Sequence, residues 1–371
     1  MSKKLLHTPE GVRDIYGREY AGKLYVEQKL HDTIISYGYE DIQTPTFEYF
    51  DVFSREIGTT PSRELYKFFD KEGNTLVLRP DFTPSIARCA AKYFMEAQEP
   101  IRFCYLGNTF TNTSNLQGKL KEVTQIGAEL INEESVEADA EMISLVIEAL
   151  KSTGLKQFQV SVGQVEYFKG ICQEAGLDGE TEEQLREYIS GKNYFDSEEL
   201  LSQKEVPEPY CSTLLKAADL FGSIDSLKKA RESVHNSRSL AAIDRLEAIY
   251  EVLKLYGVEE YVSFDLGMLS KYHYYTGIIF KAFTYGVGAP IVKGGRYDKL
   301  LQQFGKEAPA IGFAMVIDDV LEAVQYQRAE LPGGTERKVL AYTEQNYAEK
   351  LQEARESRRQ GIPTLLIRER G

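Results

Sequence analysis

The sequence predicts an α+β protein with a large core and without the commonest nucleotide-binding folds, and one observation supports each of these three points. Segments with strand periodicity mostly follow one another through short turns, as in antiparallel hairpins, with helical stretches grouped around them. The chain lacks a G-x-x-x-x-G-K-[ST] loop and a G-x-G-x-x-G turn opening a helix, which disfavours the two commonest nucleotide-binding folds. Its 371 residues, 42% of them hydrophobic, are enough to bury a large core.

Helix and strand patterns alternate through the first part of the chain. Val26, Leu30 and Ile34 recur at helical spacing, and Gly38 follows where a left-handed helix end costs little. The turn-rich stretch 70–74 separates two β-prone runs and predicts a hairpin. The next expected elements are strands at 101–105 and 123–131, a helix over 142–150 that ends by Gly154, and a strand at 158–162.

The middle of the chain changes character. Between about 167 and 258 it consists of charged helical stretches without β-rich runs between them, which predicts a helical insertion. Strand character returns at 274–283, a glycine-rich segment follows at 293–297, and 314–324 is apolar enough for a buried helix. The core therefore resumes after the insertion.

The C-terminal residues predict a small separate unit. Residues 334–371 show a strand, helix and strand pattern in which Gly361 and Pro363 end the helix. A unit of this size is too short to be a robust independent domain. We expect a core domain over 1–325, carrying the insertion, followed by this truncated α/β unit.

Charge and composition exclude several classes of protein. Lys and Arg number 44 against 57 Asp and Glu, and the net charge of −13 would repel a polyanion, so we expect no nucleic-acid partner. No apolar run reaches the ~18 residues of a membrane span, so we expect a cytoplasmic protein without membrane contact. The four cysteines lack C-x-x-C pairing and a His-rich neighbourhood, which favours simple packing and no metal site.

One predicted strand carries a candidate binding face. Residues two apart on a strand share a face, so Gln125, Gly127 and Glu129 lie together. A carboxylate there is costly unless it meets a cation, and the glycine leaves room for a ligand, so an α-ammonium group would fit. A solvent-exposed sheet face is the alternative interpretation of the same pattern.

The order of six short motifs favours the binding interpretation. In chain order they are Leu78-Arg79-Pro80-Asp81-Phe82-Thr83, Tyr105-Leu106-Gly107-Asn108-Thr109-Phe110, the segment 125–129, Tyr272-His273-Tyr274-Tyr275, Gly294-Gly295-Arg296-Tyr297-Asp298 and Ile311-Gly312-Phe313-Ala314-Met315. Together they resemble the successive motifs of histidyl-tRNA synthetases over about residues 8–324. The resemblance implies a class II aminoacyl-tRNA synthetase-like antiparallel sheet flanked by helices, and residues 44–57 resemble the dimer-forming first motif.

The resemblance also implies which residues bind histidine. Glu129 and Gln125 would contact its α-amino group, with Asp81 and Thr83 beside them. Tyr275 and Tyr297 would flank the imidazole, with Tyr274 in the same set. Acceptors for an ammonium and phenol hydroxyls for a ring nitrogen suit that ligand. One departure is that the family has Glu-Gly where this chain has Asp81-Phe82, a wall one methylene shorter with a bulkier neighbour.

The departures on the ATP side all remove positive charge. Arginines of the family are replaced by Thr111 in the second motif, by Ser270 in the histidine-specific motif and by Asp319 in the third motif. Losing one donor that stabilises transition-state charge typically costs about 2.7–4 kcal/mol, so three losses predict no adenylate-forming activity.

A synthetase-like chain without ATP chemistry or a full anticodon-binding domain is similar to the regulatory subunits of ATP phosphoribosyltransferase. That resemblance implies a non-catalytic role in the first step of histidine biosynthesis, with the short-form catalytic subunit as partner, L-histidine as feedback ligand and no cofactor. It also implies a homodimer within a hetero-oligomer. Two alternatives stay open, a structural activator that does not bind histidine and an active histidyl-tRNA synthetase.

Overall fold

A large, mostly antiparallel sheet organises the core of the computed structural model, which describes residues 6–53, 60–113, 120–269, 274–331 and 337–369. Within these residues the sheet has nine strands, in the spatial order β1 (Glu40–Asp41), β5 (Ile101–Phe110), β6 (Glu122–Ile131), β12 (Ala310–Val316), β11 (Val292–Arg296), β10 (Ile278–Thr284), β7 (Phe158–Gln164), β9 (Val262–Asp265) and β8 (Phe221–Gly222). The β1–β5 and β7–β9 pairs are parallel, and the others are antiparallel. The predicted α+β class is confirmed.

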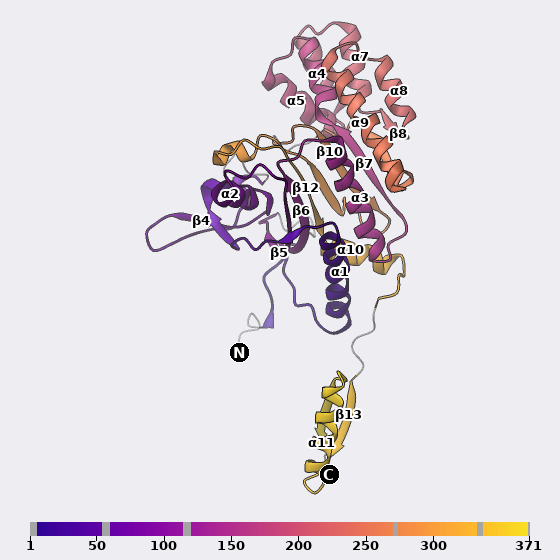
Figure 1. The fold of residues 1–371 in the computed structure, drawn as a ribbon. Helices are drawn as coiled ribbons and strands as arrows, with labels where there is room; N and C mark the ends of the chain where they lie inside the picture. Colours follow the sequence, from indigo (N-terminus) through magenta and orange to yellow (C-terminus); the bar gives the residue numbers. More distant parts are fainter. Residues whose placement is uncertain (1–5, 54–59, 114–119, 270–273, 332–336, 370–371) are drawn as a thin grey trace.

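Alternation along β5 divides the apolar core between the two faces of the sheet. Cys104 lies in the main cluster, whereas Phe103 and Tyr105 lie in a second one. The helices α1 (Gly17–Ser36), α3 (Val136–Ser152) and α10 (Ile317–Tyr326) pack on the first face, and α2 (Thr83–Tyr93) packs on the second. Figure 1 shows α1, α3 and α10 together on one side of the sheet and α2 on the other.

The ends of the core helices follow the local signals in the sequence. Helix α1 ends before Gly38, whose φ of +81° is the left-handed conformation expected there. Ser135 caps α3, because its hydroxyl accepts a hydrogen bond from Ala138 N (3.2 Å). Gly154, with φ of +88°, follows the last turn of α3. No helix within the described residues is long and apolar enough to cross a membrane.

Six helices lie between β7 and β10 in the sequence and form the body at the top of Figure 1. They are α4 (Val165–Glu174), α5 (Gly179–Ser190), α6 (Tyr194–Gln203), α7 (Glu208–Ala217), α8 (Asp225–Glu232) and α9 (Ser237–Tyr256), counted within the described residues. Helix α9 packs against both α3 and α4, so it joins this helical body to the core. The strands β8 and β9 return the chain to the large sheet.

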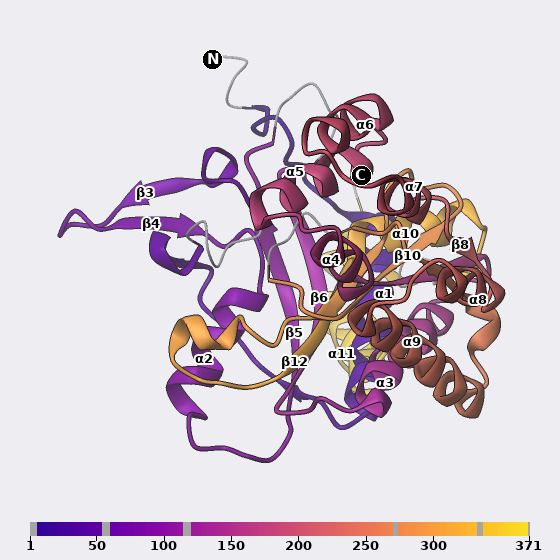
Figure 2. The ribbon, with the colours of Figure 1, turned by 90° about the horizontal axis from the view of Figure 1, so that it is seen from above.

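A small three-stranded sheet projects from the core, as Figure 2 shows for its β3–β4 hairpin. Its strands lie in the order β2 (Phe47–Tyr49), β4 (Thr75–Leu78) and β3 (Lys67–Phe69). The hairpin turn is held by Asn74 N, which donates to Asp70 Oδ1 (2.8 Å), and Gly73 takes φ of +88°. The predicted hairpin is confirmed.

The C-terminal elements form a unit of their own. Strands β13 (Lys338–Tyr342) and β14 (Thr364–Arg368) are parallel, and α11 (Tyr347–Arg359) covers one face of the pair. Figure 1 shows this unit lying apart from the sheet and its helices. The hydrogen bonds shown for it join residues within the unit, such as Lys338 N to the Pro363 carbonyl (2.9 Å).

Two expected boundaries were wrong. Residues 314–316 belong to β12 rather than to a helix, because Ala314 and Met315 pair with Gly127 and Ile126 of β6. An apolar run alone cannot distinguish a buried strand from a buried helix. Strand β10 begins at Ile278 rather than at 274.

Candidate functional site

A cavity of about 200 Å³ opens on the sheet face that carries Tyr105 and α2. Its floor comes from β6, β12 and the end of β11, which are neighbours in the sheet. The described residues that line it are Thr60, Pro80, Asp81, Thr83, Thr111, Gln125, Glu129, Tyr274, Tyr275, Pro290, Ile291, Lys293, Tyr297, Gly312, Phe313, Ala314 and Val316. All seven predicted histidine-binding residues are among them, although they come from segments more than 200 residues apart.

Glu129 is a buried carboxyl group at the floor of this cavity. It is 1% exposed, so the alternative of a solvent-exposed sheet face was wrong. Thr83 Oγ1 donates to Glu129 Oε1 (2.7 Å), and the Tyr297 hydroxyl donates to Glu129 Oε2. Burial raises the pKa of Glu129 to about 8, against the lowering effect of the two hydroxyls and with a further rise from the negative charge of Asp81. This raised pKa favours a protonated Glu129 at neutral pH.

Gly312 makes room for that carboxyl group. It lies directly opposite Glu129 in the β6–β12 pair. A Cβ atom built on Gly312 would overlap Glu129 Oε2. A side chain at Gly312 would therefore displace the carboxyl from its two hydroxyl partners.

The expected use of Gly127 was wrong. A Cβ atom there would overlap the Tyr105 hydroxyl and the Phe313 carbonyl oxygen, so the space is filled by protein rather than left for a ligand. Tyr105 donates from its hydroxyl to the Phe313 carbonyl (3.3 Å) and is 1% exposed. Gly127 thus lets Tyr105 support the floor of the pocket, a role that the local pattern did not reveal.

Two more polar side chains, Gln125 and Asp81, line the cavity. The amide oxygen Oε1 of Gln125 is buried and accepts no hydrogen bond within the described residues. Such a group costs free energy until a donor reaches it. Asp81 lines the same cavity, and its Oδ1 accepts from Thr83 N (3.3 Å). Two carboxyl groups and an unused acceptor suit a ligand that brings positive charge and several N–H donors.

Three tyrosines form the aromatic side of the cavity. The rings of Tyr274 and Tyr275 are 4.7 Å apart, and Tyr274 meets Tyr297 edge to face at 6.0 Å. Gly295 brings the sheet close to Tyr275, because a Cβ there would lie 2.7 Å from the ring. This arrangement fits a flat ligand group, and the role of these rings in holding an imidazole stays a prediction.

Phe82 does not line the cavity, although the sequence predicted a bulkier residue beside the Asp81 wall. Its ring stacks on Tyr105 at 4.3 Å and lies 3.9 Å below the guanidinium of Arg79. Arg79 is itself held by the carbonyls of Asn108 (2.8 Å) and Thr44 (2.9 Å). The Phe82 ring therefore packs between Tyr105 and Arg79, outside the pocket. Of Asp81 and Phe82, only Asp81 lines the cavity.

The predicted ATP-side positions fall in different places. Thr111 lines the cavity, whereas Asp319 lies in the first turn of α10 and does not. Burial raises the pKa of Asp319 to about 6, with a further rise from Asp318 and Glu322 and a lowering by Lys293. Ser270 lies outside the described residues, as do residues 54–57 of the segment that resembles the dimer-forming motif. The first turn of α10 is thus acidic where the family has an arginine.

Lys293 is a cavity residue that the sequence comparison missed. It lies on β11 beside Ile291 and Pro290, and it brings an ammonium group to the site. The cavity is therefore not devoid of cations, although the three family arginines are absent. Its position could have been found only from the β11–β12 register, where Lys293 pairs with Ala314.

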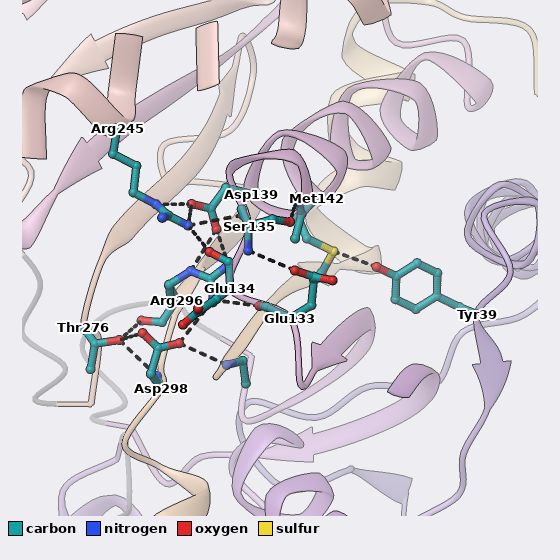
Figure 3. Close-up of polar contacts among 12 residues, drawn as sticks. Tyr39, Glu133, Glu134, Ser135, Asp139, Met142, Arg245, Thr276, Arg296 and Asp298 are labelled. Carbon is teal, nitrogen blue, oxygen red and sulfur yellow. Dashed lines mark hydrogen bonds and ion pairs between the residues drawn. The ribbon is translucent and has the colours of Figure 1, made fainter. Parts of the chain in front are cut away.

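A buried ion network holds Arg296, the last residue of β11 and the chain neighbour of Tyr297. Figure 3 shows this network. Arg296 donates to Asp139 Oδ1 through Nε (2.9 Å) and Nη2 (2.5 Å), and Arg245 Nε donates to Asp139 Oδ2 (2.7 Å). Arg296 and Asp139 are 4% and 0% exposed. Arg245 belongs to α9, so the network joins the helical insertion to α3 and to the residue next to Tyr297.

One group outside the cavity bears on the expectation of no metal site. His31 Nε2 lies 2.8 Å from Asp41 Oδ1, and both are near Cys104. Burial raises the pKa of the Cys104 thiol to about 12, which keeps it in the protonated form that binds metals poorly. The cluster is thus a half-buried histidine paired with an exposed aspartate beside a buried thiol.

Comparisons with known proteins agree on one family. The family model described as histidyl-tRNA synthetase matches residues 11–320. An ATP phosphoribosyltransferase regulatory subunit of Acetivibrio thermocellus is 41% identical over 98% of this chain and 87% of its own length. The one of Ruminiclostridium cellulolyticum is 43% identical over 88% of this chain and 78% of its own length.

A solved structure extends the similarity to the fold. The Bacillus halodurans protein described as an ATP phosphoribosyltransferase regulatory subunit/histidyl-tRNA synthetase has a TM-score of 0.89 and 32% identity, covering 98% of this chain and 93% of that one. The chain belongs to the ATP phosphoribosyltransferase regulatory subunits of the histidyl-tRNA synthetase family.

Proposed function

We propose that the cavity around Glu129 binds free L-histidine, and that this binding regulates the catalytic subunit of an ATP phosphoribosyltransferase. The chain is a regulatory relative of the synthetases in histidine biosynthesis, rather than an enzyme. The acidic first turn of α10 and Thr111 in the cavity agree with that role, because adenylate formation needs cations at the phosphates.

The buried carboxyl of Glu129 is the observation that carries this proposal. A carboxyl with hydroxyl partners, a second carboxyl nearby and an unused amide acceptor are together matched by an α-ammonium group. The tyrosine rings on the other side of the cavity supply a flat, partly polar surface for an imidazole.

Regulation requires that histidine binds two states of the complex with different affinities. Tyr297 touches the ligand site, and its neighbour Arg296 is bonded to the core helix α3 and, through Asp139, to α9. This chain of contacts offers a route by which an occupied pocket changes the position of the helical insertion. We further propose that the chain forms a homodimer, and that this homodimer binds the short-form catalytic subunit in a hetero-oligomer.

A titration of histidine tests the pocket assignment. We expect Glu129→Gln to weaken histidine binding about 10- to 100-fold at pH 8.5, because a hydrogen bond to a charged group contributes about 1.5–3 kcal/mol. Glu122→Gln is the matched control, since Glu122 lies on the same strand and accepts from Asn108 Nδ2 (2.7 Å) outside the cavity. Calorimetry should give wild-type affinity for the control, and unaltered binding by Glu129→Gln would contradict the assignment.

Reconstitution with a catalytic subunit tests the regulatory part. Co-purification and light scattering should give a hetero-oligomer containing pairs of this chain. Glu129→Gln should still assemble and activate the catalytic subunit but should lose inhibition by histidine. If inhibition persists in that variant, the feedback site lies elsewhere, and the chain acts as a structural activator.

A further inference from the structure

Arg79 is a buried cation close to the cavity around Glu129, and the histidine site proposed above does not use it. It is 6% exposed, although an arginine is almost never buried to that extent unless it is paired. The carboxylate that acts on it, Glu48, is instead hydrogen-bonded to Arg88 (2.7 Å). Within the described residues, the hydrogen bonds of the Arg79 side chain go to backbone carbonyl oxygens. A buried charge held in this way has a cost that folding alone does not explain.

The five-residue segment 79–83 contributes to two cavities. Asp81 and Thr83 line the cavity around Glu129. Arg79 and Phe82 line a separate cavity of about 470 Å³, and no described residue lines both. Because the two sets of positions alternate along five residues, a change in how Arg79 is held changes the backbone that carries Asp81 and Thr83.

A stack of three side chains connects Arg79 to the floor of the pocket. Its guanidinium lies 3.9 Å from the centre of the Phe82 ring, and that ring lies 4.3 Å from the ring of Tyr105. The Tyr105 hydroxyl donates to the carbonyl of Phe313 (3.3 Å), which lines the pocket. A guanidinium is attracted to the face of an aromatic ring, so Arg79 stabilises this stack from its outer end.

Gly107 admits the stack next to a pocket residue. A Cβ atom built on Gly107 would lie 2.6 Å from Arg79 Nη2 and 3.1 Å from Phe82 Cζ. Gly107 is the direct partner of Gln125 in the β5–β6 pair, and directly paired residues share a face of the sheet. The guanidinium therefore takes the place of a side chain beside Gln125. The Gln125 amide oxygen is the buried acceptor that has no hydrogen bond within the described residues.

Arg79 also binds the part of the chain that leads into the small sheet. Its backbone N donates to the Thr46 carbonyl (2.9 Å), and its Nη1 donates to the Thr44 carbonyl (2.9 Å). On the other side, Phe110 N donates to the Arg79 carbonyl (3.0 Å). Residues 44–46 directly precede β2, so Arg79 links the small sheet and β5 to the pocket segment.

We propose that Arg79 is a positioning residue for the histidine site, and that it sets the place of Asp81 and Thr83 through the carbonyls and the aromatic stack that it holds. Thr83 in turn donates from its hydroxyl to Glu129 (2.7 Å). Arg79 is not among the described residues that line the pocket, so it acts without touching the ligand. This inference rests on the proposed histidine site and adds the small sheet to the elements that influence its affinity.

Titration calorimetry with the full chain tests the effect on the pocket. Arg79→Met keeps an unbranched side chain over Phe82 but removes the donors. We expect it to weaken histidine binding at least about tenfold, because hydrogen bonds from a charged group are lost. Arg79→Lys keeps the charge with a different donor geometry, so its affinity should lie between those of the wild type and Arg79→Met. Wild-type affinity in Arg79→Met, or equal affinities in the two variants, would overturn the proposal.

Arg102→Met is the matched control. Arg102 is also an arginine over an aromatic ring, that of Tyr39 (5.2 Å), and it donates to Glu141 (3.1 Å). It lies on β5 two residues from Cys104, so it belongs to the sheet face away from the pocket. Both variants should unfold at lower urea concentrations, whereas only Arg79→Met should lose histidine affinity. An equal loss of affinity in both would make Arg79 a general structural contact and remove its positioning role.

Hydrogen exchange of the free protein gives a result that does not depend on histidine. We expect the backbone amides of residues 81–86 to exchange faster in Arg79→Met and not in Arg102→Met, because the segment loses its anchor. Unchanged exchange in Arg79→Met overturns the proposal. If the wild-type chain does not bind histidine while Arg79→Met shows the faster exchange, the proposed function fails and Arg79 still positions the segment.

Discussion

Glu129 makes the stability of the protein depend on pH in an unusual direction. Its carboxyl has an ordinary pKa of 4.5, and burial raises the pKa to about 8 in the folded chain. Between these values the unfolded state loses its proton while the folded state keeps it, so the free energy of unfolding falls as pH rises from about 4.5 to about 8. The full penalty is on the order of 5 kcal/mol, at about 1.36 kcal/mol per pKa unit.

Urea unfolding at several pH values measures this effect. We expect Glu129→Gln to lose less stability than the wild type between pH 5 and pH 8, because a neutral amide carries no ionisation penalty. Equal slopes for the two proteins would show that Glu129 ionises normally in the folded state.

The same carboxyl should couple ligand binding to proton release. A bound α-ammonium group favours ionised Glu129, so histidine binding lowers its pKa and expels a proton below about pH 8. Affinity should therefore rise with pH from 6 to 8 and then level off. Calorimetry in buffers of different ionisation enthalpy should show the released proton, and Glu129→Gln should show none. A heat of binding that is the same in every buffer would contradict this coupling.

Gly312 is predicted to be intolerant of any side chain. Gly312→Ala should displace the Glu129 carboxyl and cost about 1–3 kcal/mol of stability, with loss of histidine binding. Gly288→Ala is the matched control, because a Cβ there meets no atom within 4 Å. Urea midpoints and a histidine titration check both variants, and a stable Gly312→Ala that binds histidine would refute the steric argument.

The residues of the pocket were predictable only in part. The ordered motifs brought Asp81, Gln125 and Glu129 together correctly, as the cavity lining shows. Gly312 and Lys293 were missed as cavity residues, because their positions depend on the register of β12 and β11 against strands far away in the chain. The pattern of one strand does not show which distant strand lies beside it.

At the scale of elements, Asp139 is the contact that holds three parts of the molecule together. It receives Arg296 from β11 and Arg245 from α9, and burial raises the pKa of its carboxyl despite both arginines. Asp139→Asn would leave Arg296 buried with less compensation, so we expect a loss of about 3–5 kcal/mol. Glu148→Gln, on the same helix, is the control, because its exposed pair with Lys151 contributes less than about 1 kcal/mol.

Denaturant unfolding of these two variants checks the difference. If Asp139→Asn keeps wild-type stability, the ion network does not stabilise the contact between α3, α9 and β11. A histidine titration of the same variant shows whether the ion network also sets the position of Tyr297. Weaker binding in a folded Asp139→Asn would support the route from the pocket to the insertion.

Element types were easier to predict than element ends. The hairpin around residues 70–74 and the helix before Gly38 have local turn or stop residues that determine them. The boundary between β12 and α10 has none, since apolar residues run through it, and pairing with β6 decides where the strand stops. Tertiary contacts therefore supplied what the local sequence could not.

At the scale of the whole molecule, the C-terminal unit should be dispensable for the core. Its hydrogen bonds are internal, and Figure 1 shows it apart from the sheet. A chain ending at residue 331 should keep the thermal midpoint of the core and its affinity for histidine. A lower midpoint would indicate contacts between the unit and the core.

The placement of β6 also matters while the protein is being made. One edge of β6 pairs with β5 at once, but its other edge waits for β12, which is synthesised about 10–35 s later at typical elongation rates. During that interval the nascent chain exposes an unpaired apolar strand, the kind of edge on which aggregation begins. Glu129 belongs to this edge strand, and a charged side chain on an edge strand disfavours pairing with another chain. The residue proposed to bind the ligand in the folded protein therefore also opposes aggregation of the nascent chain.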